Sequence, residues 1–151
     1  NKMKTLFFIA IILFAVQSVI AQITPGMEPA GQTPVGKQHK IVFQLTSEDT
    51  LAHKALMKQL NNITTVTPDT KIEVVCHGPG LNMLLKSKTV VQDKIIQLKK
   101  KDIVFVACEF SMSEKNISKE KMIPEAGYVK FGILHIVTRQ EEGWSYIKSG
   151  F

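Results

Sequence analysis

From His39 to the end of the chain, short apolar segments alternate with segments of helical periodicity. Apolar residues spaced three and four positions apart predict amphipathic helices, one from about Leu51 to Ile63 and one from Val91 to Leu98. Three apolar, β-branched runs predict buried strands: Ile41 to Leu45, Ile72 to Cys76 and Ile103 to Ala107. This alternation predicts a three-layer α/β/α domain with a mostly parallel sheet.

The chain after the third strand predicts one more helix and two more strands. Ser111 is followed three residues later by Glu114, which matches a capping box and predicts a helix that begins near Met112. Gly132 to Val137 is predicted as a fourth strand, and Trp144 to Lys148 as a short fifth strand. The expected sheet therefore has five strands.

The amino terminus has the three parts of a secretory signal. Lys2 and Lys4 precede an apolar run from Leu6 to Val16, and Val19-Ile20-Ala21 then forms the cleavage region before Gln22. A retained membrane anchor would need ~20 apolar residues to span a bilayer, and this run is shorter. We therefore expect a signal peptide over residues 1–21, and a periplasmic or secreted product that keeps no stable membrane anchor after cleavage behind Ala21.

Residues 22–38 are rich in proline and glycine and have almost no apolar periodicity. This composition predicts a flexible linker. Residues 39–151 then form the single folded domain, which is long enough to bury one hydrophobic core.

Composition agrees with a globular protein and argues against a nucleic-acid partner. The formal charge of +6 falls to +4 when Lys2 and Lys4 leave with the signal peptide. A nucleic-acid-binding protein gathers basic and aromatic residues on one face, whereas these lysines are scattered. The triplet from Lys99 to Lys101 is interpreted as the solvated end of a helix, where cations suit the helix dipole.

The histidines do not predict a metal site, and no cofactor motif is present. His39, His53, His77 and His135 show no paired ligand spacing. His135 falls in the predicted fourth strand, where it is expected to be a core or interface residue. The sequence has neither a phosphate-binding P-loop nor a nucleophile elbow.

Both cysteines fall at the carboxyl ends of predicted strands, where ligands and reactive groups gather in open parallel sheets. Cys108 precedes a predicted helix, whose amides favour a thiolate, so it is the candidate nucleophile or sulfur carrier. The alternative is a small buried hydrophobic residue. A disulfide between Cys76 and Cys108 depends on strand order, since it requires neighbouring strands.

The segment after the second strand supplies the candidate ligand-binding residues. His77 follows Cys76 directly, but adjacent residues of a strand point to opposite faces, which weakens the case for a thiol activated by this imidazole. Gly78 and Gly80 serve a turn or, alternatively, an anion site. Together with Ser111, these two glycines and His77 form the candidate ligand-binding set.

Three stretches resemble the DsrE/DsrF-like family. They are Val74 to Leu81 (VVCHGPGL), Phe105 to Met112 (FVACEFSM) and Gln140 to Lys148 (QEEGWSYIK). The likeness covers nearly all of residues 40–149, in the family's order. It implies a five-stranded parallel sheet and assembly as a homotrimer or homohexamer.

Some relatives in this family relay sulfur as a cysteine persulfide, and the family's cysteine after the third strand matches Cys108. Together with the predicted signal peptide, the resemblance implies an exported sulfur carrier, without catalytic turnover, that exchanges sulfur with a donor or acceptor protein. The alternative function is a noncatalytic oligomeric module that binds a small ligand or a protein partner in the same cleft.

Overall fold

The computed structural model describes residues 38–150, and the signal peptide and almost all of the linker predicted above lie outside this range. The strands are β1 (Lys40–Leu45), β2 (Lys71–Cys76), β3 (Val104–Cys108), β4 (Gly127–Val129) and β5 (Ser145–Ser149). The α-helices are α2 (Thr50–Val66), α3 (Gln92–Lys99), α4 (Glu109–Glu114) and α5 (Gly132–Glu141). Two 3-10 helices, η2 (Gly78–Leu84) and η3 (Lys119–Lys121), complete the described elements.

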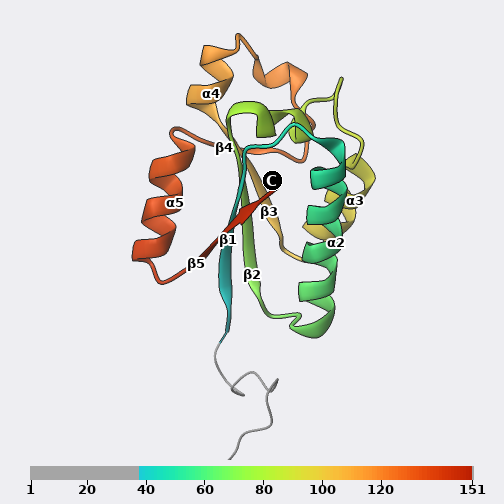
Figure 1. Cartoon of the computed structure of the whole chain (residues 1–151), viewed down its shortest axis with the longest axis vertical. Helices are drawn as coiled ribbons and strands as arrows, with labels where there is room; N and C mark the ends of the chain where they lie inside the picture. Colours follow the sequence, from blue (N-terminus) through green and yellow to red (C-terminus); the bar gives the residue numbers. More distant parts are fainter. Residues whose placement is uncertain (1–37, 151) are drawn as a thin grey trace, which may run out of the picture. The chain divides into compact units, whose positions relative to one another are not determined.

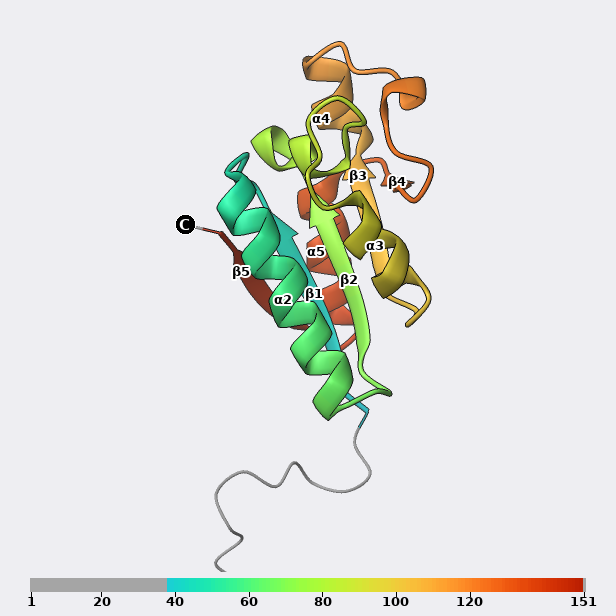
Figure 2. The ribbon, with the colours of Figure 1, turned by 90° about the vertical axis from the view of Figure 1, so that its right-hand side faces the viewer.

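The five strands form one parallel sheet in the order β4-β3-β2-β1-β5. Figure 1 shows the sheet nearly edge on, with α5 on one face and α2 and α3 on the other. Figure 2 shows α2 and α3 side by side in front of the strands. The predicted α/β class with a five-stranded parallel sheet is confirmed.

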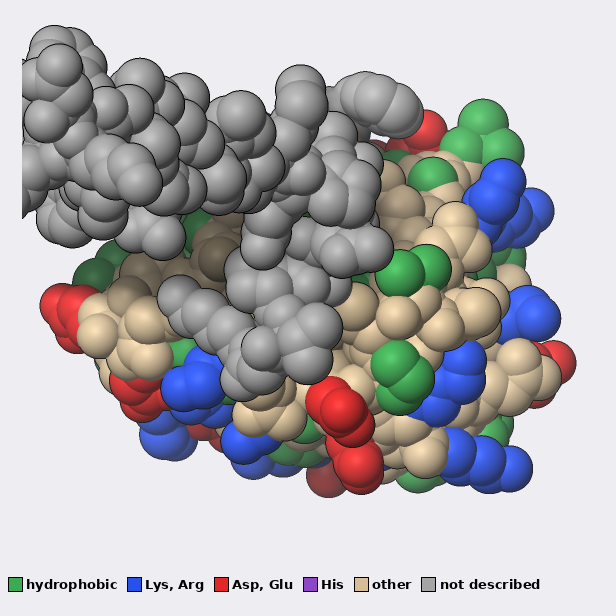
Figure 3. Space-filling view, turned by 90° about the horizontal axis from the view of Figure 1, so that it is seen from below, with side chains coloured by type: hydrophobic (Ala, Val, Ile, Leu, Met, Phe, Trp, Pro, Cys, Tyr) green, Lys and Arg blue, Asp and Glu red, His purple; other side chains and the backbone are tan. Residues whose placement is uncertain are grey.

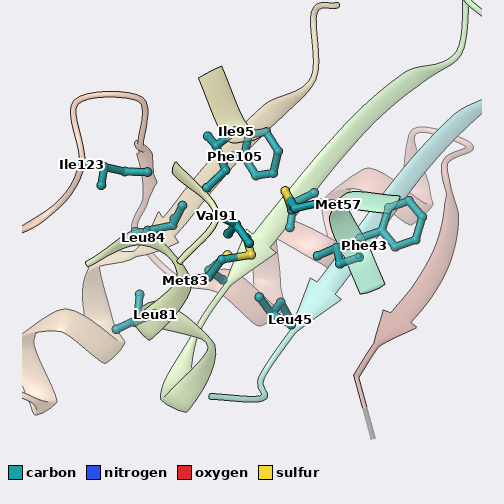
Figure 4. Packing of buried hydrophobic residues seen from close by; sticks show 14 of the residues in the cluster. Phe43, Leu45, Met57, Leu81, Met83, Leu84, Val91, Ile95, Phe105 and Ile123 are labelled. Carbon is teal, nitrogen blue, oxygen red and sulfur yellow. The ribbon is translucent and has the colours of Figure 1, made fainter. Parts of the chain in front are cut away.

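The two faces of the sheet have cores of different size, because successive side chains of a strand point to opposite faces. The larger core packs β1, β2 and β3 against α2, α3 and η2, and Figure 4 shows part of it. The smaller core lies on the α5 face and consists of Val42, Val75, Val106 and Ile136. This face therefore carries fewer apolar side chains and leaves room for polar ones.

The predicted helix after β1 is confirmed as α2, and it begins at an aspartate cap. Oδ1 of Asp49 accepts a hydrogen bond from the backbone N–H of Leu51 at 2.8 Å, which satisfies one of the first amides of the helix. The helix continues to Val66, three residues beyond the predicted end. It stops just before Pro68, a residue that favours helix termination.

The predicted fourth strand at Gly132 to Val137 is wrong, because this segment begins helix α5. His135 consequently lies on a helix and not in a strand. His135 and Arg139 are one helical turn apart, and both reach the carboxylate of Glu73 on β2, with N···O distances of 2.7 and 2.6 Å. Glu73 is buried, so a helix that presents two hydrogen-bonding partners to it, one of them the Arg139 guanidinium, is favoured over a strand.

The fourth strand of the sheet is instead β4, a three-residue strand that pairs with β3. Three residues are too few to show the alternation by which a strand is recognised in sequence. The predicted fifth strand is confirmed as β5, shifted by one residue.

Charged side chains are interspersed on the end of the domain where the strands begin, as Figure 3 shows for the surface visible there. Within residues 38–150, no helix has the length and apolar character needed to cross a membrane. The same residues contain no group of three or more His, Cys, Asp or Glu side chains that could hold a metal ion.

Candidate functional site

Cys108 ends β3 and is at the same time the N-cap of α4. Its Sγ accepts a hydrogen bond from the backbone N–H of Ser111 at 3.5 Å. The capping box predicted at Ser111 is therefore wrong, and α4 begins at Glu109. The strand passes directly into the helix, which places Ser111 in the first turn and gives the capping role to the cysteine sulfur.

A second backbone amide reaches the same sulfur from a distant segment. The N–H of Gly132, the first residue of α5, lies 3.2 Å from Sγ of Cys108. The carbonyl oxygen of Lys130 lies 3.9 Å from the sulfur and can accept the weak S–H bond of the thiol. Two N–H groups directed at one sulfur favour negative charge on it, as at other helix amino termini that hold anions.

The carboxylate nearest to Cys108 in sequence is neutralised by two lysines. Glu109 forms ion pairs with Lys119 at 2.6 Å and Lys130 at 2.8 Å. Hydrogen bonds from these two ammonium groups lower the pKa of Glu109 to about 2. Glu109 and its two lysine partners together carry a net charge of +1.

Access to the sulfur is narrow, because Cys108 is only 4% exposed. Phe110, two residues after Cys108, and Phe131, next to Gly132, are exposed, and their rings are tilted against each other with centroids 5.5 Å apart. Cys108 lines none of the three pockets described within residues 38–150. A reaction at this thiol therefore requires movement of the residues around it.

The structure brings three of the four predicted ligand-binding residues close to Cys108. The hydroxyl oxygen of Ser111 accepts a hydrogen bond from the N–H of Gly78 at 3.1 Å, which links α4 to the segment after β2. A Cβ added at Gly132 would lie 3.2 Å from Cβ of Cys108 and 3.4 Å from Cβ of His77. These two side chains thus lie against the same glycine.

Gly80, the fourth predicted residue, has a packing role in the fold. A Cβ at this position would lie 2.1 Å from the carbonyl oxygen of Leu45, so only glycine fits against the end of β1. The turn predicted over His77 to Gly80 is the beginning of 3-10 helix η2. Gly78 has a positive φ of 53°, a conformation that glycine adopts readily.

A chain of polar side chains crosses the sheet on the α5 face from β5 to the end of β2. The hydroxyl of Tyr146 donates to Oε1 of Gln44, and Nε2 of Gln44 lies 2.7 Å from Nε2 of His77. With the amide oriented in this way, its N–H donates to the ring, and the proton of neutral His77 lies on Nδ1. Burial lowers the pKa of His77, which favours this neutral form.

Gln44 and Tyr146 are missing from the residues predicted by sequence. The available signal is that glutamine interrupts an otherwise apolar strand, Ile41 to Leu45. The hydrogen-bonded side chains of Tyr146 and Gln44 also bridge β5 and β1, the two strands between which the strand order changes direction. Open α/β sheets bind ligands at such a boundary.

Cys76 is separated from Cys108 although their strands are neighbours. Cys76 pairs in register with Ala107, and both belong to the larger core under α2 and α3. Cys108, one residue further on, points to the α5 face, because side chains alternate along a strand. Both cysteines are free, and burial raises the pKa of Cys76, which keeps it a thiol.

Comparison with known proteins agrees with this architecture. The chain is similar to MTH1491 of Methanobacterium thermoautotrophicum, a protein of unknown function, with a TM-score of 0.70 and 25% identity over 74% of this chain and 99% of that one. It is also similar in fold to the ychN protein of E. coli, with a TM-score of 0.59, 8% identity and coverage of 74% and 99%. The corresponding values for BT1422 of Bacteroides thetaiotaomicron are 0.56, 12%, 72% and 93%.

The comparison with curated proteins gives no match. The model of the DsrE/DsrF-like family matches residues 39–149, which include all five strands and Cys108. The match extends over most of the chain and agrees with the parallel five-stranded sheet. The chain therefore belongs to the DsrE/DsrF-like family.

Proposed function

We propose that this protein carries a sulfane sulfur as a persulfide on Cys108. The observation that carries the proposal is the pair of amides, from Ser111 and Gly132, directed at one cysteine sulfur. These donors come from two separate segments of the fold. They stabilise a sulfur anion directly, so the stabilisation does not depend on a basic side chain. Membership of a family related to sulfur relay supports the same chemistry.

The transfer requires no outside oxidant. The Cys108 thiolate attacks the outer sulfur of a donor persulfide, and the donor's S–S bond breaks as the new S–S bond forms. The donor leaves as a thiolate and takes up the proton that Cys108 released. An acceptor thiolate then attacks the outer sulfur on Cys108, which returns to a thiolate, so the protein carries sulfur without net change in its own oxidation state.

The experiment incubates the reduced protein with inorganic polysulfide and locates added sulfur by peptide mass spectrometry. We expect one added sulfur atom on the peptide that contains Cys108, and none on this peptide after Cys108→Ser. Cys76 is the internal control, since it is completely buried on the other face. An unmodified Cys108, or equal labelling of the wild type and the Cys108→Ser variant, would contradict the proposal.

A noncatalytic binding module is the second candidate, and the 4% exposure of Cys108 favours it. In this case the cysteine serves as the cap of α4, and the polar chain from His77 to Tyr146 lies beside the ligand. The Cys108→Ser variant separates the two functions. A binding module keeps its ligand affinity after Cys108→Ser, whereas a sulfur carrier loses its sulfur uptake.

We further propose that the protein forms a homo-oligomer, a trimer or hexamer, through the outer face of α5. Large apolar side chains are exposed on α5, at its N-cap and on α4: Phe110, Phe131, Ile133, Leu134 and Val137. Exposed apolar groups in such number are typical of an interface. Light scattering should give a trimer or hexamer for the wild type and a smaller species after Ile133→Glu and Leu134→Glu. An unchanged mass would place the contact elsewhere.

Export remains part of the proposed function. We propose that residues 1–21 are removed after Ala21 and that the domain acts in the periplasm or outside the cell, where it exchanges sulfur with a donor or acceptor protein. Expression of the full chain in a bacterium, followed by fractionation and amino-terminal sequencing, should recover a product that begins at Gln22. A full-length product in the cytoplasm would contradict export.

A further inference from the structure

A groove between α2 and α3 lies on the face of the sheet opposite the sulfur of Cys108. Its volume is about 530 Å³, which is ample for a small ligand. Figure 2 shows the two helices side by side over the strands. We infer that this groove binds a small polyanion, a molecule with several phosphate-type or sulfate-type oxyanion groups.

Each helix directs one face to the groove. On α2 the residues are Lys54, Met57 and Lys58, on α3 they are Lys94 and Leu98, and Lys101 follows just after the end of α3. Lys54 and Lys58 are four residues apart on α2, and Lys94 and Leu98 are four residues apart on α3, so each pair lies on one side of its helix. The methionine and leucine are buried, with 4% and 3% exposure, and form the floor, while the four lysines are exposed around it.

No carboxylate balances the charge of the groove. Aspartate and glutamate are absent from its lining, and within residues 38–150 none of the four lysines forms an ion pair. Nζ of Lys101 donates instead to Asn61 at 3.0 Å and to Thr64 at 3.3 Å, which holds this ammonium group in place. A concave surface that carries one sign of charge concentrates anions.

The arrangement lowers stability in the absence of a ligand. Lys54 and Lys58 are four residues apart on one helix, a spacing at which like charges repel each other. A bound polyanion converts this repulsion into attraction. Val90, which is 54% exposed, also lines the groove, but the four ammonium groups and the amides of Asn61 and Gln97 supply donors for oxyanions, which favours a compact polyanion over a lipid tail.

The test measures binding of tripolyphosphate to the full domain by isothermal titration calorimetry at low ionic strength. The groove variant is Lys54→Gln, Lys58→Gln and Lys94→Gln combined, with Lys101 retained because it contacts α2. The control variant is Lys71→Gln, Lys88→Gln and Lys115→Gln, three exposed lysines outside the groove. Both variants lose the same net charge.

We expect saturable binding that weakens about tenfold or more in the groove variant and less than about threefold in the control variant. Without ligand, the groove variant should melt at the same or a higher temperature than the wild type, which shows that it folds. Absence of saturable binding to the wild type, or an equal loss in both variants, would overturn the inference.

A parallel titration with ATP identifies the source of the oxyanions. ATP has a triphosphate chain like the probe and adds a nucleoside. Tighter binding of ATP than of tripolyphosphate, lost in the groove variant, supports the inference with a nucleotide as the ligand. Equal or weaker binding of ATP supports it with the oxyanion chain itself as the recognised group.

Discussion

The backbone N–H of Gly132 donates a hydrogen bond to Sγ of Cys108 across 3.2 Å, and this contact joins the start of α5 to the end of β3. The two residues are 24 positions apart. Their contact is close because glycine has no side chain, and a Cβ at position 132 would lie 3.2 Å from Cβ of Cys108 and 3.3 Å from Cγ1 of Val75. The candidate site and the packing of α5 therefore depend on the same glycine.

Gly132→Ala should destabilise the domain. The added methyl group must displace Cys108, Val75 or His77 by a few tenths of an ångström, so we expect the free energy of unfolding to fall by about 1–3 kcal/mol. Urea denaturation followed by circular dichroism measures this change. Ser113→Ala, at an exposed position of α4, is the control and should change stability by less than about 0.5 kcal/mol. Equal stability of the two variants would contradict the tight packing described here.

Substitutions of Cys108 separate its capping role from its chemistry. Serine retains an acceptor for the N–H of Ser111 and is itself a favourable N-cap, so Cys108→Ser should stay close to wild-type stability. Alanine leaves two buried amides without an acceptor and should cost about 1–3 kcal/mol. Chemical denaturation of both variants measures the difference. Equal stability of serine and alanine variants would mean that the sulfur does not cap α4.

His77 should make the domain sensitive to mild acid. Its pKa is lowered in the folded state, so between the ordinary value near 6.5 and the lowered value the unfolded chain binds more protons, and stability falls as the pH falls. The free energy of unfolding at pH 7.5 and at pH 5.5 measures this loss. His77→Gln should reduce the difference between the two pH values, whereas Ser113→Ala, which removes no titratable group, should leave it unchanged. An unaltered difference in the His77 variant would refute this account.

The two thiols should differ in reactivity, and no disulfide should join them. Cys76 is fully buried and its pKa is raised by burial, so iodoacetamide should label it only after unfolding. Its side chain and that of Cys108 point to opposite faces, so oxidation of the folded protein should leave them unlinked. Non-reducing peptide mapping tests both statements. An intramolecular Cys76–Cys108 bridge in folded protein would contradict the assigned faces.

Glu73→Gln should weaken the attachment of α5 to the sheet. The substitution removes the buried negative charge that faces both His135 and Arg139, and we expect a loss of about 3 kcal/mol. Glu142→Gln removes the other, exposed carboxylate that contacts Arg139 and should have a much smaller effect. Thermal and chemical denaturation of both variants provides the measurement. A larger effect at position 142 would contradict the buried role of Glu73.

Sequence alone determined the strands that are covered on both faces and the family to which the chain belongs. β1, β2 and β3 are mostly apolar, β-branched runs, interrupted by Gln44 in β1 and Glu73 in β2, because strands covered by helices on both sides are largely shielded from water. The candidate cysteine was also found from sequence, since parallel strands place reactive groups at their carboxyl ends. Both conclusions depend on local patterns a few residues long.

Tertiary structure decided the features that depend on distant residues. The segment from Gly132 is apolar and β-branched, and it is a helix in which His135 and Arg139, on one helical face, both bond the buried carboxylate of Glu73 on β2. Cys108 receives a second amide, from Gly132, only because α5 begins beside the end of β3. The faces of Cys76 and Cys108 follow from the pairing of neighbouring strands. Local patterns cannot reveal such contacts, since burial of a charge or a thiol is set by residues that only folding brings together.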